Sequence, residues 1–227
     1  IAGFPSHPHR GIETVTYMLA GEFEHKDSTG GEGRMTAGDV QWMKTGSGII
    51  HSEMPAMKEG KLHGFQLWIN MPASLKMSKP EYHYIDANEM SVHHDEDKKI
   101  KVIAGKFENA EGPIKKHNVQ PIFFDVELKQ NKQFSFSIPK SHNSFVYLVD
   151  GGIKIGNQPH DNIEGSKLVL LTNGNNLKVS AETNAKFLLI AGEPIGESIA
   201  RGGPFVMNTK SEIIQAINDY NNGTFVR

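Results

Sequence analysis

Two short segments place metal-binding side chains two residues apart, and this spacing restricts the local fold. The first segment is His7-Pro8-His9 and the second is His51-Ser52-Glu53. Side chains at positions i and i+2 point to the same face of an extended strand, whereas on a helix they do not face each other. We therefore expect both segments to be β-strands, and if the strands are neighbours they aim three imidazoles and one carboxylate at one point.

Three nitrogen ligands and one oxygen ligand suit a divalent transition metal that keeps open positions for water or substrate. A closed structural zinc site would more often use cysteine, and the chain has none. Taken alone, His7 and His9 could also be two solvated histidines in a loop, and Glu53 could also be a surface carboxylate. The second pair, at the same spacing, favours a metal site over both alternatives.

Short alternating segments surround these pairs and predict an all-β sandwich or barrel. Glycine and proline separate them at residues 37–39, 45–48 and 71–72. The strands expected in this part of the chain are residues 13–25 (two strands around a tight turn at Gly21), 40–43, 49–51 and 62–70. We interpret residues 73–99 as a polar connector with a charged surface loop at 93–99.

A second series of strands follows, and its sequence partly repeats the first. These strands are expected at residues 100–105, 122–128, 133–138, 145–155, 167–171, 177–181 and 186–191. Thr16-Tyr-Met-Leu-Ala-Gly21 resembles Val146-Tyr-Leu-Val-Asp-Gly151. This repeat aligns the first module's His7, His9 and Glu13 with Ser137, Pro139 and Asn143 of the second. We therefore expect two copies of one β module, of which the second has lost its metal ligands.

One helix is expected near the end of the chain. Thr209-Lys-Ser-Glu212 matches a capping box, and Gly223 can end the helix. Ile213, Ile217 and Tyr220 are predicted to form an apolar stripe on one face, which needs a partner surface.

Composition excludes several classes of function. The net charge is −2 and the isoelectric point is about 6.6, so no basic surface for nucleic acid or an anionic membrane is expected. No apolar run is long enough to span a bilayer. The absence of cysteine fits a reducing cytoplasm, which is the location we expect.

Two longer stretches resemble the signature of the pirins, a family of the cupin superfamily. They are Gly3–Tyr17 and Gly38–Glu53, and the likeness continues through residues 65–72 and 203–209. The resemblance implies an all-β bicupin, with two tandem jelly-roll β-barrel modules face to face and a short C-terminal helix.

The implied domains are an N-terminal metal-binding module at residues 1–85 and a degenerate module at 100–195. A tail at 196–227 is expected to pack its helix back on the body. The resemblance also implies a further stretch of chain before residue 1 in the full-length protein.

The resemblance implies that the ligands of one mononuclear metal ion are His7, His9, His51 and Glu53. Iron is the metal we expect, with manganese, nickel, copper, cobalt and zinc left open. In many cupins the carboxylate at the position of Glu13 is a ligand, whereas in pirins the one at Glu53 replaces it. Glu13 is then expected to be structural or to orient a ligand imidazole.

Other candidate residues receive structural interpretations. Arg10 is expected in a salt bridge rather than on an anionic substrate. His25 and His63 are interpreted as surface or satisfied core histidines, and His93-His94 as part of a solvated loop. Trp42, Phe65 and Trp68 are expected in the barrel core, where inward-facing members could line a pocket.

Two functions from different classes follow from the resemblance. One is an oxygenase of the quercetin 2,3-dioxygenase type, in which a planar polyphenol binds the metal and is cleaved with O2, and Glu53 is both ligand and proton acceptor. The other is a non-enzymatic, iron-dependent regulator that binds a transcription factor or a metabolic enzyme. Near-neutral charge argues against direct DNA contact, and a monomer is expected. Both functions need the same four ligands, so both stay open at this point.

Overall fold

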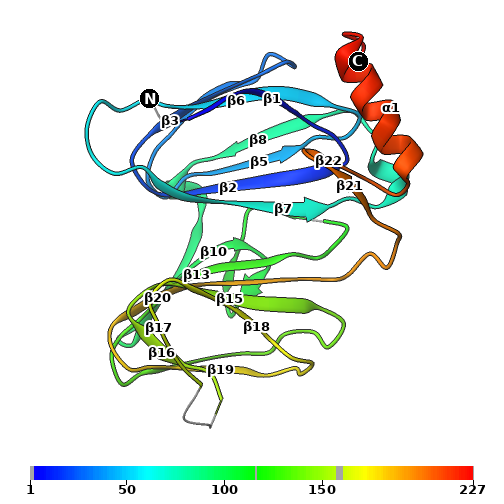
Figure 1. Ribbon diagram of the computed structural model, residues 1–227. Coiled ribbons are helices and arrows are strands. Elements are labelled where there is room, and N and C mark those ends of the chain that lie inside the picture. Colours follow the sequence, from blue (N-terminus) through cyan, green and yellow to red (C-terminus); the bar gives the residue numbers. More distant parts are fainter. Residues whose placement is uncertain (1–2, 116, 157–160, 227) are drawn as a thin grey trace. The chain divides into compact units, whose positions relative to one another are not determined.

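The computed structural model describes residues 3–115, 117–156 and 161–226, and these are mostly β-strands. The chain divides into two compact units (Figure 1). Unit 1 comprises residues 1–87 and 195–227, and unit 2 comprises residues 88–194. The predicted all-β fold with two β modules and a C-terminal helix is confirmed.

Unit 1 contains two four-stranded antiparallel sheets. The first has the order β1 (Phe4–His9), β6 (Ile49–Pro55), β3 (Phe23–Asp27) and β4 (Glu32–Met35). The second has the order β7 (His63–Asn70), β2 (Ile12–Ala20), β5 (Val40–Lys44) and β8 (Glu81–Ile85). The turn from β2 to β3 requires glycine, because Gly21 has a φ of 83°.

Unit 2 repeats this arrangement with a six-stranded and a four-stranded sheet. The six-stranded sheet has the order β18 (Lys167–Leu170), β15 (Asn143–Asp150), β20 (Ala185–Gly192), β13 (Ile122–Leu128), β10 (Lys98–Ala104) and β9 (Ser91–His94). The four-stranded sheet has the order β14 (Gln133–Phe136), β19 (Leu177–Ala181), β16 (Gly152–Lys154) and β17 (Asn162–Glu164), and β11 (Lys106–Phe107) pairs with β12 (Ala110–Glu111). The strands predicted for the second series are present, except that residues 145–155, predicted as one strand, form β15 and β16 in different sheets, with a turn at Gly151, whose φ is 84°.

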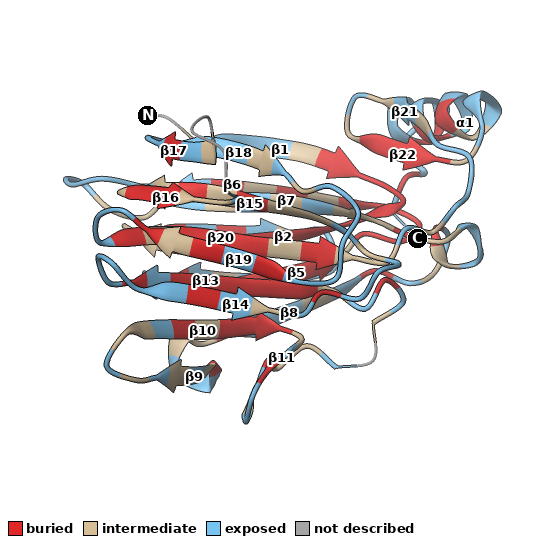
Figure 2. Cartoon of the chain, turned by 90° about the horizontal axis from the view of Figure 1, so that it is seen from below, coloured by how far each residue is buried: buried red, intermediate tan, exposed pale blue. Residues whose placement is uncertain are grey.

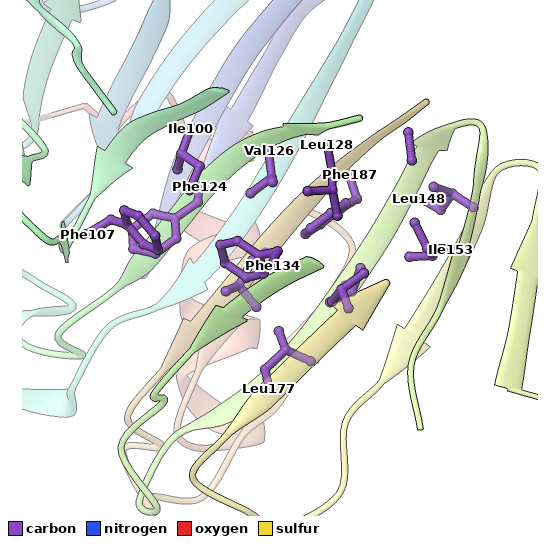
Figure 3. Packing of buried hydrophobic residues seen from close by; sticks show 14 of the residues in the cluster. Ile100, Phe107, Phe124, Val126, Leu128, Phe134, Leu148, Ile153, Leu177 and Phe187 are labelled. Atoms are coloured by element: carbon purple, nitrogen blue, oxygen red, sulfur yellow. The ribbon is translucent and has the colours of Figure 1, made fainter. Parts of the chain in front are cut away.

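Apolar side chains fill the interior of unit 2 (Figure 3). Phe124, Phe134 and Phe187 are fully buried there, and the Phe134 and Phe187 rings meet edge to face with centroids 5.6 Å apart. Figure 2 shows buried residues along the central strands of both units, such as β2 and β13. Burial of β13 is nearly continuous along its apolar residues, whereas β2 also buries the polar side chains of Glu13, Thr14 and Thr16.

The interpretation of residues 73–99 as a connector was wrong in part. Two short 3-10 turns, η1 (Ala73–Leu75) and η2 (Ala87–Glu89), do lie there, but so do β8 and β9. Both strands lie at the edge of a sheet and leave many residues at the surface, so they lack the apolar pattern of a central strand. His93 is therefore in a strand and not in a solvated loop, and its Nε2 lies 3.1 Å from Asp95 Oδ2.

The segment after residue 195 completes unit 1. It forms a hairpin of β21 (Ala200–Gly202) and β22 (Phe205–Met207) and then helix α1 (Lys210–Asn221). Phe205, Met207, Ile213, Ala216 and Phe225 form one buried cluster. Among the described residues, no helix has the length and apolar character needed to cross a membrane.

Helix α1 begins with the predicted capping box at Thr209 and Glu212. The predicted apolar stripe was wrong, however, because Ile217 and Tyr220 are 42% and 40% exposed. The buried residues of the helix are Ile213, Ala216 and Asp219. Asp219 belongs to this face because its carboxylate pairs with the buried Arg10 guanidinium at 2.7 Å, and this ion pair confirms the structural interpretation of Arg10.

Candidate metal centre

The two pairs of ligand candidates lie on neighbouring strands. β1 and β6 are antiparallel, and His7 lies directly opposite His51 in their register. Directly opposite residues on one face of a sheet have close side chains, so this register brings the two imidazoles together. Their Nε2 atoms are 2.9 Å apart.

His7, His9 and His51 form one compact group. One ring nitrogen from each lies within 4.8 Å of the others. His9 and His51 are buried, and His7 is half-buried. The His7 Nδ1 lies 2.8 Å from the Pro5 carbonyl oxygen, which places a proton on Nδ1 and leaves Nε2 as the metal-binding atom.

Glu53 lies in a second group that shares His51 with the first. Its carboxylate and one nitrogen each of His25 and His51 lie within 4.8 Å of one another, and all three residues are buried. The sequence interpretation left His25 out of the site. The sequence does show i, i+2 spacing at His25 and Asp27, but only the register of β3 with β6 brings them to the site, with His25 opposite Glu53 and Asp27 opposite His51.

The first group fits a metal ion. Neither ring nitrogen of the buried His9 has a partner in good hydrogen-bond geometry among the described residues, and the Pro204 backbone, which favours the protonated ring, can account for one nitrogen at most. Buried polar atoms without partners are rare and indicate an absent ligand or water. Two nitrogen ligands at about 2.1 Å from one ion lie roughly 3 Å apart when they bind at right angles, which matches His7 and His51.

The protonation states also suit a metal. Burial, and then the nearby His7, lowers the pKa of His9 to about 4 and that of His51 to about 2. Both imidazoles are therefore neutral near pH 7, and a neutral imidazole can donate a lone pair to a metal. In contrast, both nitrogens of His25 have polar neighbours, Asp27 Oδ2 at 2.8 Å and Gln41 Nε2 at 3.1 Å.

Hydrogen bonds hold the Glu53 carboxylate in place. Gln66 Nε2 donates to Oε1 at 3.1 Å and to Oε2 at 2.9 Å, and Thr16 Oγ1 donates to Oε1 at 3.3 Å. The Trp68 indole, which can only donate, lies 3.2 Å from Gln66 Oε1 and so fixes the orientation of the amide. Burial raises the pKa of Glu53 despite these hydrogen bonds.

Glu13 lies outside both groups. Its Oε2 accepts a hydrogen bond of 2.6 Å from the Trp42 indole, and both side chains are buried. Trp42 is a core residue as predicted, but Trp68 is not, because it is 36% exposed. Trp68 packs edge-on against His9 with ring centroids 5.1 Å apart, so it covers one side of the first group.

A pocket of about 520 Å³ adjoins Glu53. Its side-chain walls are Phe4, Met18, Phe23, Leu62 and Phe65, and its polar end is formed by Thr16, Glu53 and Gln66. Pockets of this size and apolar character are typical of small-molecule sites. Glu53 is the one carboxylate among the lining residues.

Comparison with known proteins agrees with this arrangement. The family model Pirin matches residues 1–69, and the model Pirin C-terminal cupin domain matches residues 123–226. A pirin-like protein of Caulobacter vibrioides is 42% identical over 227 residues, which cover 99% of this chain and 81% of the relative. Pirin-1 of Arabidopsis thaliana is 41% identical over 225 residues, with 97% and 77% covered.

Solved structures share the fold. A crystal structure of quercetin 2,3-dioxygenase from Acinetobacter baumannii superposes with a TM-score of 0.91 at 36% identity, covering 98% of this chain and 79% of that one. The bacterial pirin YhhW of Escherichia coli, solved in complex with nickel(II), is 24% identical with a TM-score of 0.67, covering 85% and 76%. Since the matches reach both units and nearly all of the chain, this protein belongs to the pirin family.

Proposed function

We propose that the protein is a metal-dependent dioxygenase of the quercetin 2,3-dioxygenase type, which cleaves a flavonol with O2. The observation that carries this proposal is the apolar pocket in which Glu53, a neighbour of His51, is the carboxylate among the lining residues. Further support comes from the 36% identity to the Acinetobacter baumannii enzyme.

We assign His7, His9, His51 and Glu53 as the ligands of one metal ion, with iron as the expected metal. When bound, such an ion supplies Lewis acidity and a template that orients substrate oxygens. Three nitrogen donors and one oxygen donor also accept manganese, nickel, copper, cobalt or zinc.

The protein's own residues bind and orient the substrate. The aromatic and aliphatic walls at Phe4, Leu62 and Phe65 suit the planar rings of a polyphenol. Gln66 and Thr16 hold the Glu53 carboxylate at that end, so it can take the proton of the substrate's enolic hydroxyl.

Anaerobic loading with Fe(II), followed by quercetin in air, tests the proposal. Loss of the flavonol absorption together with carbon monoxide release is the expected result. Glu53→Gln keeps the shape of the side chain and removes its basicity, so a variant that still binds metal should lose turnover by about 10²–10⁴-fold. Glu24→Gln, at an exposed position of β3, is the matched control.

Two outcomes would contradict this function. Iron-loaded protein that consumes no O2 with any flavonol tested would favour the non-enzymatic regulator. A fully active Glu53→Gln variant would move the base to another residue, with Glu13 the next to test.

A further inference from the structure

Asp27 and His25 form a buried pair on β3, next to His51. Asp27 Oδ2 lies 2.8 Å from His25 Nε2, and both side chains are fully buried. The other oxygen of Asp27 accepts hydrogen bonds from the Thr29 amide, the Thr29 hydroxyl and the Gly31 amide, at 2.7, 2.6 and 3.1 Å. Burial raises the pKa of Asp27, but these bonds and His25 together lower it below its usual value, so Asp27 is a carboxylate.

The ionised carboxylate decides where the proton of His25 is. A carboxylate can only accept, so Nε2 of His25 carries the hydrogen and its Nδ1 carries the lone pair. Two groups face that lone pair, Gln41 Nε2 at 3.1 Å and His51 Nδ1 at 3.5 Å. A hydrogen on Nδ1 of His51 would meet this lone pair, whereas a lone pair there would be repelled by it. The lone pair of His7 Nε2 also faces His51 Nε2, at 2.9 Å, so this tautomer of His51 requires a cation between the two Nε2 atoms.

The other nitrogen of His51 faces the metal-binding group. With the hydrogen on Nδ1, the lone pair is on Nε2, the atom that lies 2.9 Å from His7 Nε2. We propose that Asp27 and His25 are positioning residues, which hold His51 in the tautomer that presents Nε2 to the metal. This inference rests on the proposed function, because it takes His51 to be a metal ligand.

The contacts of His25 argue that it supports a ligand and is not one itself. Its Nε2 is held by Asp27 and its Nδ1 faces Gln41. One face of the ring stacks on Tyr82, with centroids 4.6 Å apart and planes 19° apart. His9, in contrast, has two ring nitrogens with no partner in good hydrogen-bond geometry among the described residues. The lone pair open to a metal is therefore on His9.

Unit 2 offers a matched control for this pair. His93 and Asp95 have the same i, i+2 spacing, and His93 Nε2 lies 3.1 Å from Asp95 Oδ2. Asp95 is much more exposed than Asp27, at 37% of its side chain, and His93 belongs to neither group of metal-binding residues. Asp95→Asn therefore makes the same chemical change in the other unit, at a residue outside both groups of metal-binding residues.

Asp27→Asn tests the inference, because an amide can donate where the carboxylate accepted. An NH2 group facing His25 Nε2 moves the hydrogen of His25 to Nδ1, which reverses the tautomer of His51 and puts a hydrogen on its Nε2. We expect the affinity for Zn(II), used as a redox-silent probe, to fall about 10–100-fold, as for other partners that orient metal ligands. Asp95→Asn should bind Zn(II) as tightly as the wild type.

A spectroscopic measurement reads the tautomer directly. Long-range ¹H–¹⁵N spectra of Zn(II)-loaded protein with ¹⁵N-labelled histidine should show wild-type His51 bound through Nε2 with a hydrogen on Nδ1, and should show that the hydrogen bond from Nδ1 is lost or the bound nitrogen changed in Asp27→Asn. Zn(II) bound through Nδ1 of wild-type His51, or unchanged Zn(II) affinity in a folded Asp27→Asn protein, would overturn the inference. Wild-type protein that binds neither Zn(II) nor Fe(II) would instead refute the proposed function.

A second variant covers the case in which Asp27→Asn does not fold. His25→Phe keeps a ring against Tyr82 and removes the nitrogen that faces His51. It should weaken Zn(II) binding by a similar factor and still reach one equivalent at saturation. Complete loss of stoichiometric Zn(II) would make His25 a ligand and would also overturn the inference.

Discussion

The two units have similar strand arrangements, but the interior of unit 1 contains polar and charged side chains, whereas that of unit 2 is mainly apolar. The structure describes fifteen buried polar or charged residues, and all but Asp125 belong to unit 1. The interior of unit 2 is filled by apolar residues such as Phe124, Phe134 and Phe187. A β scaffold of this kind therefore provides inward-facing positions, and the residues at those positions decide whether the unit has a candidate functional site or only a hydrophobic core.

The difference has an energetic side. A buried polar group costs free energy unless it is paired, whereas a buried apolar group stabilises the fold directly. Unit 1 pairs most of its buried polar groups and leaves a lone pair of His9 for a ligand. Both groups of metal-binding residues found among the described residues are in unit 1.

The largest effect should come from removing a shared ligand. His51→Ala deletes the imidazole common to both groups, so the protein should no longer retain a stoichiometric metal ion in elemental analysis. His142→Ala, in unit 2, should keep it. Full metal content in His51→Ala would contradict this contrast between the two units, and so would a second anomalous-scattering peak within residues 100–195.

Arg10→Met should destabilise unit 1 strongly. The substitution removes the cation that faces the buried Asp219 carboxylate, and breaking such a pair costs about 3–5 kcal/mol. Chemical denaturation measures the loss. Arg34→Met, which breaks the exposed ion pair with Glu22, should cost under about 1 kcal/mol; equal losses would mean that burial does not set the strength of these pairs.

Phe134→Ala should destabilise unit 2 by a comparable amount and leave the metal content unchanged. The ring is fully buried, and truncating a buried phenylalanine costs about 3–5 kcal/mol. Thermal unfolding and elemental analysis of the same sample check both parts. A loss of metal in the folded variant would show that the two interiors are coupled.

The smallest effects separate the two faces of α1. Ile213→Ala removes a side chain that is 8% exposed and should cost about 2–3 kcal/mol, whereas Ile217 is 42% exposed and Ile217→Ala should cost about 0.5 kcal/mol or less. The matched pair needs only two melting curves. A larger loss of stability for Ile217→Ala than for Ile213→Ala would instead support the apolar stripe predicted from the sequence.

The central strands and the i, i+2 pairs at His7 and His51 could be predicted because their patterns are local. What could not be predicted depends on pairing between distant segments. The edge strands β8 and β9 lack an apolar pattern and form by hydrogen bonding to β5 and β10. His25 reaches the site through the register of β3 with β6, and the buried face of α1 depends on where Arg10 lies.

The pairing of distant segments also sets the order in which the two units can finish folding during synthesis. Unit 2 is one continuous segment, whereas unit 1 needs residues 195–226, which leave the ribosome after all of unit 2. Until then Arg10 lacks Asp219, and the Nζ of the buried Lys76 lacks the Val206 carbonyl that it contacts at 2.7 Å. Domains tend to fold as units as they emerge from the ribosome. Unit 1 therefore finishes folding after unit 2, although its first residues are translated earlier.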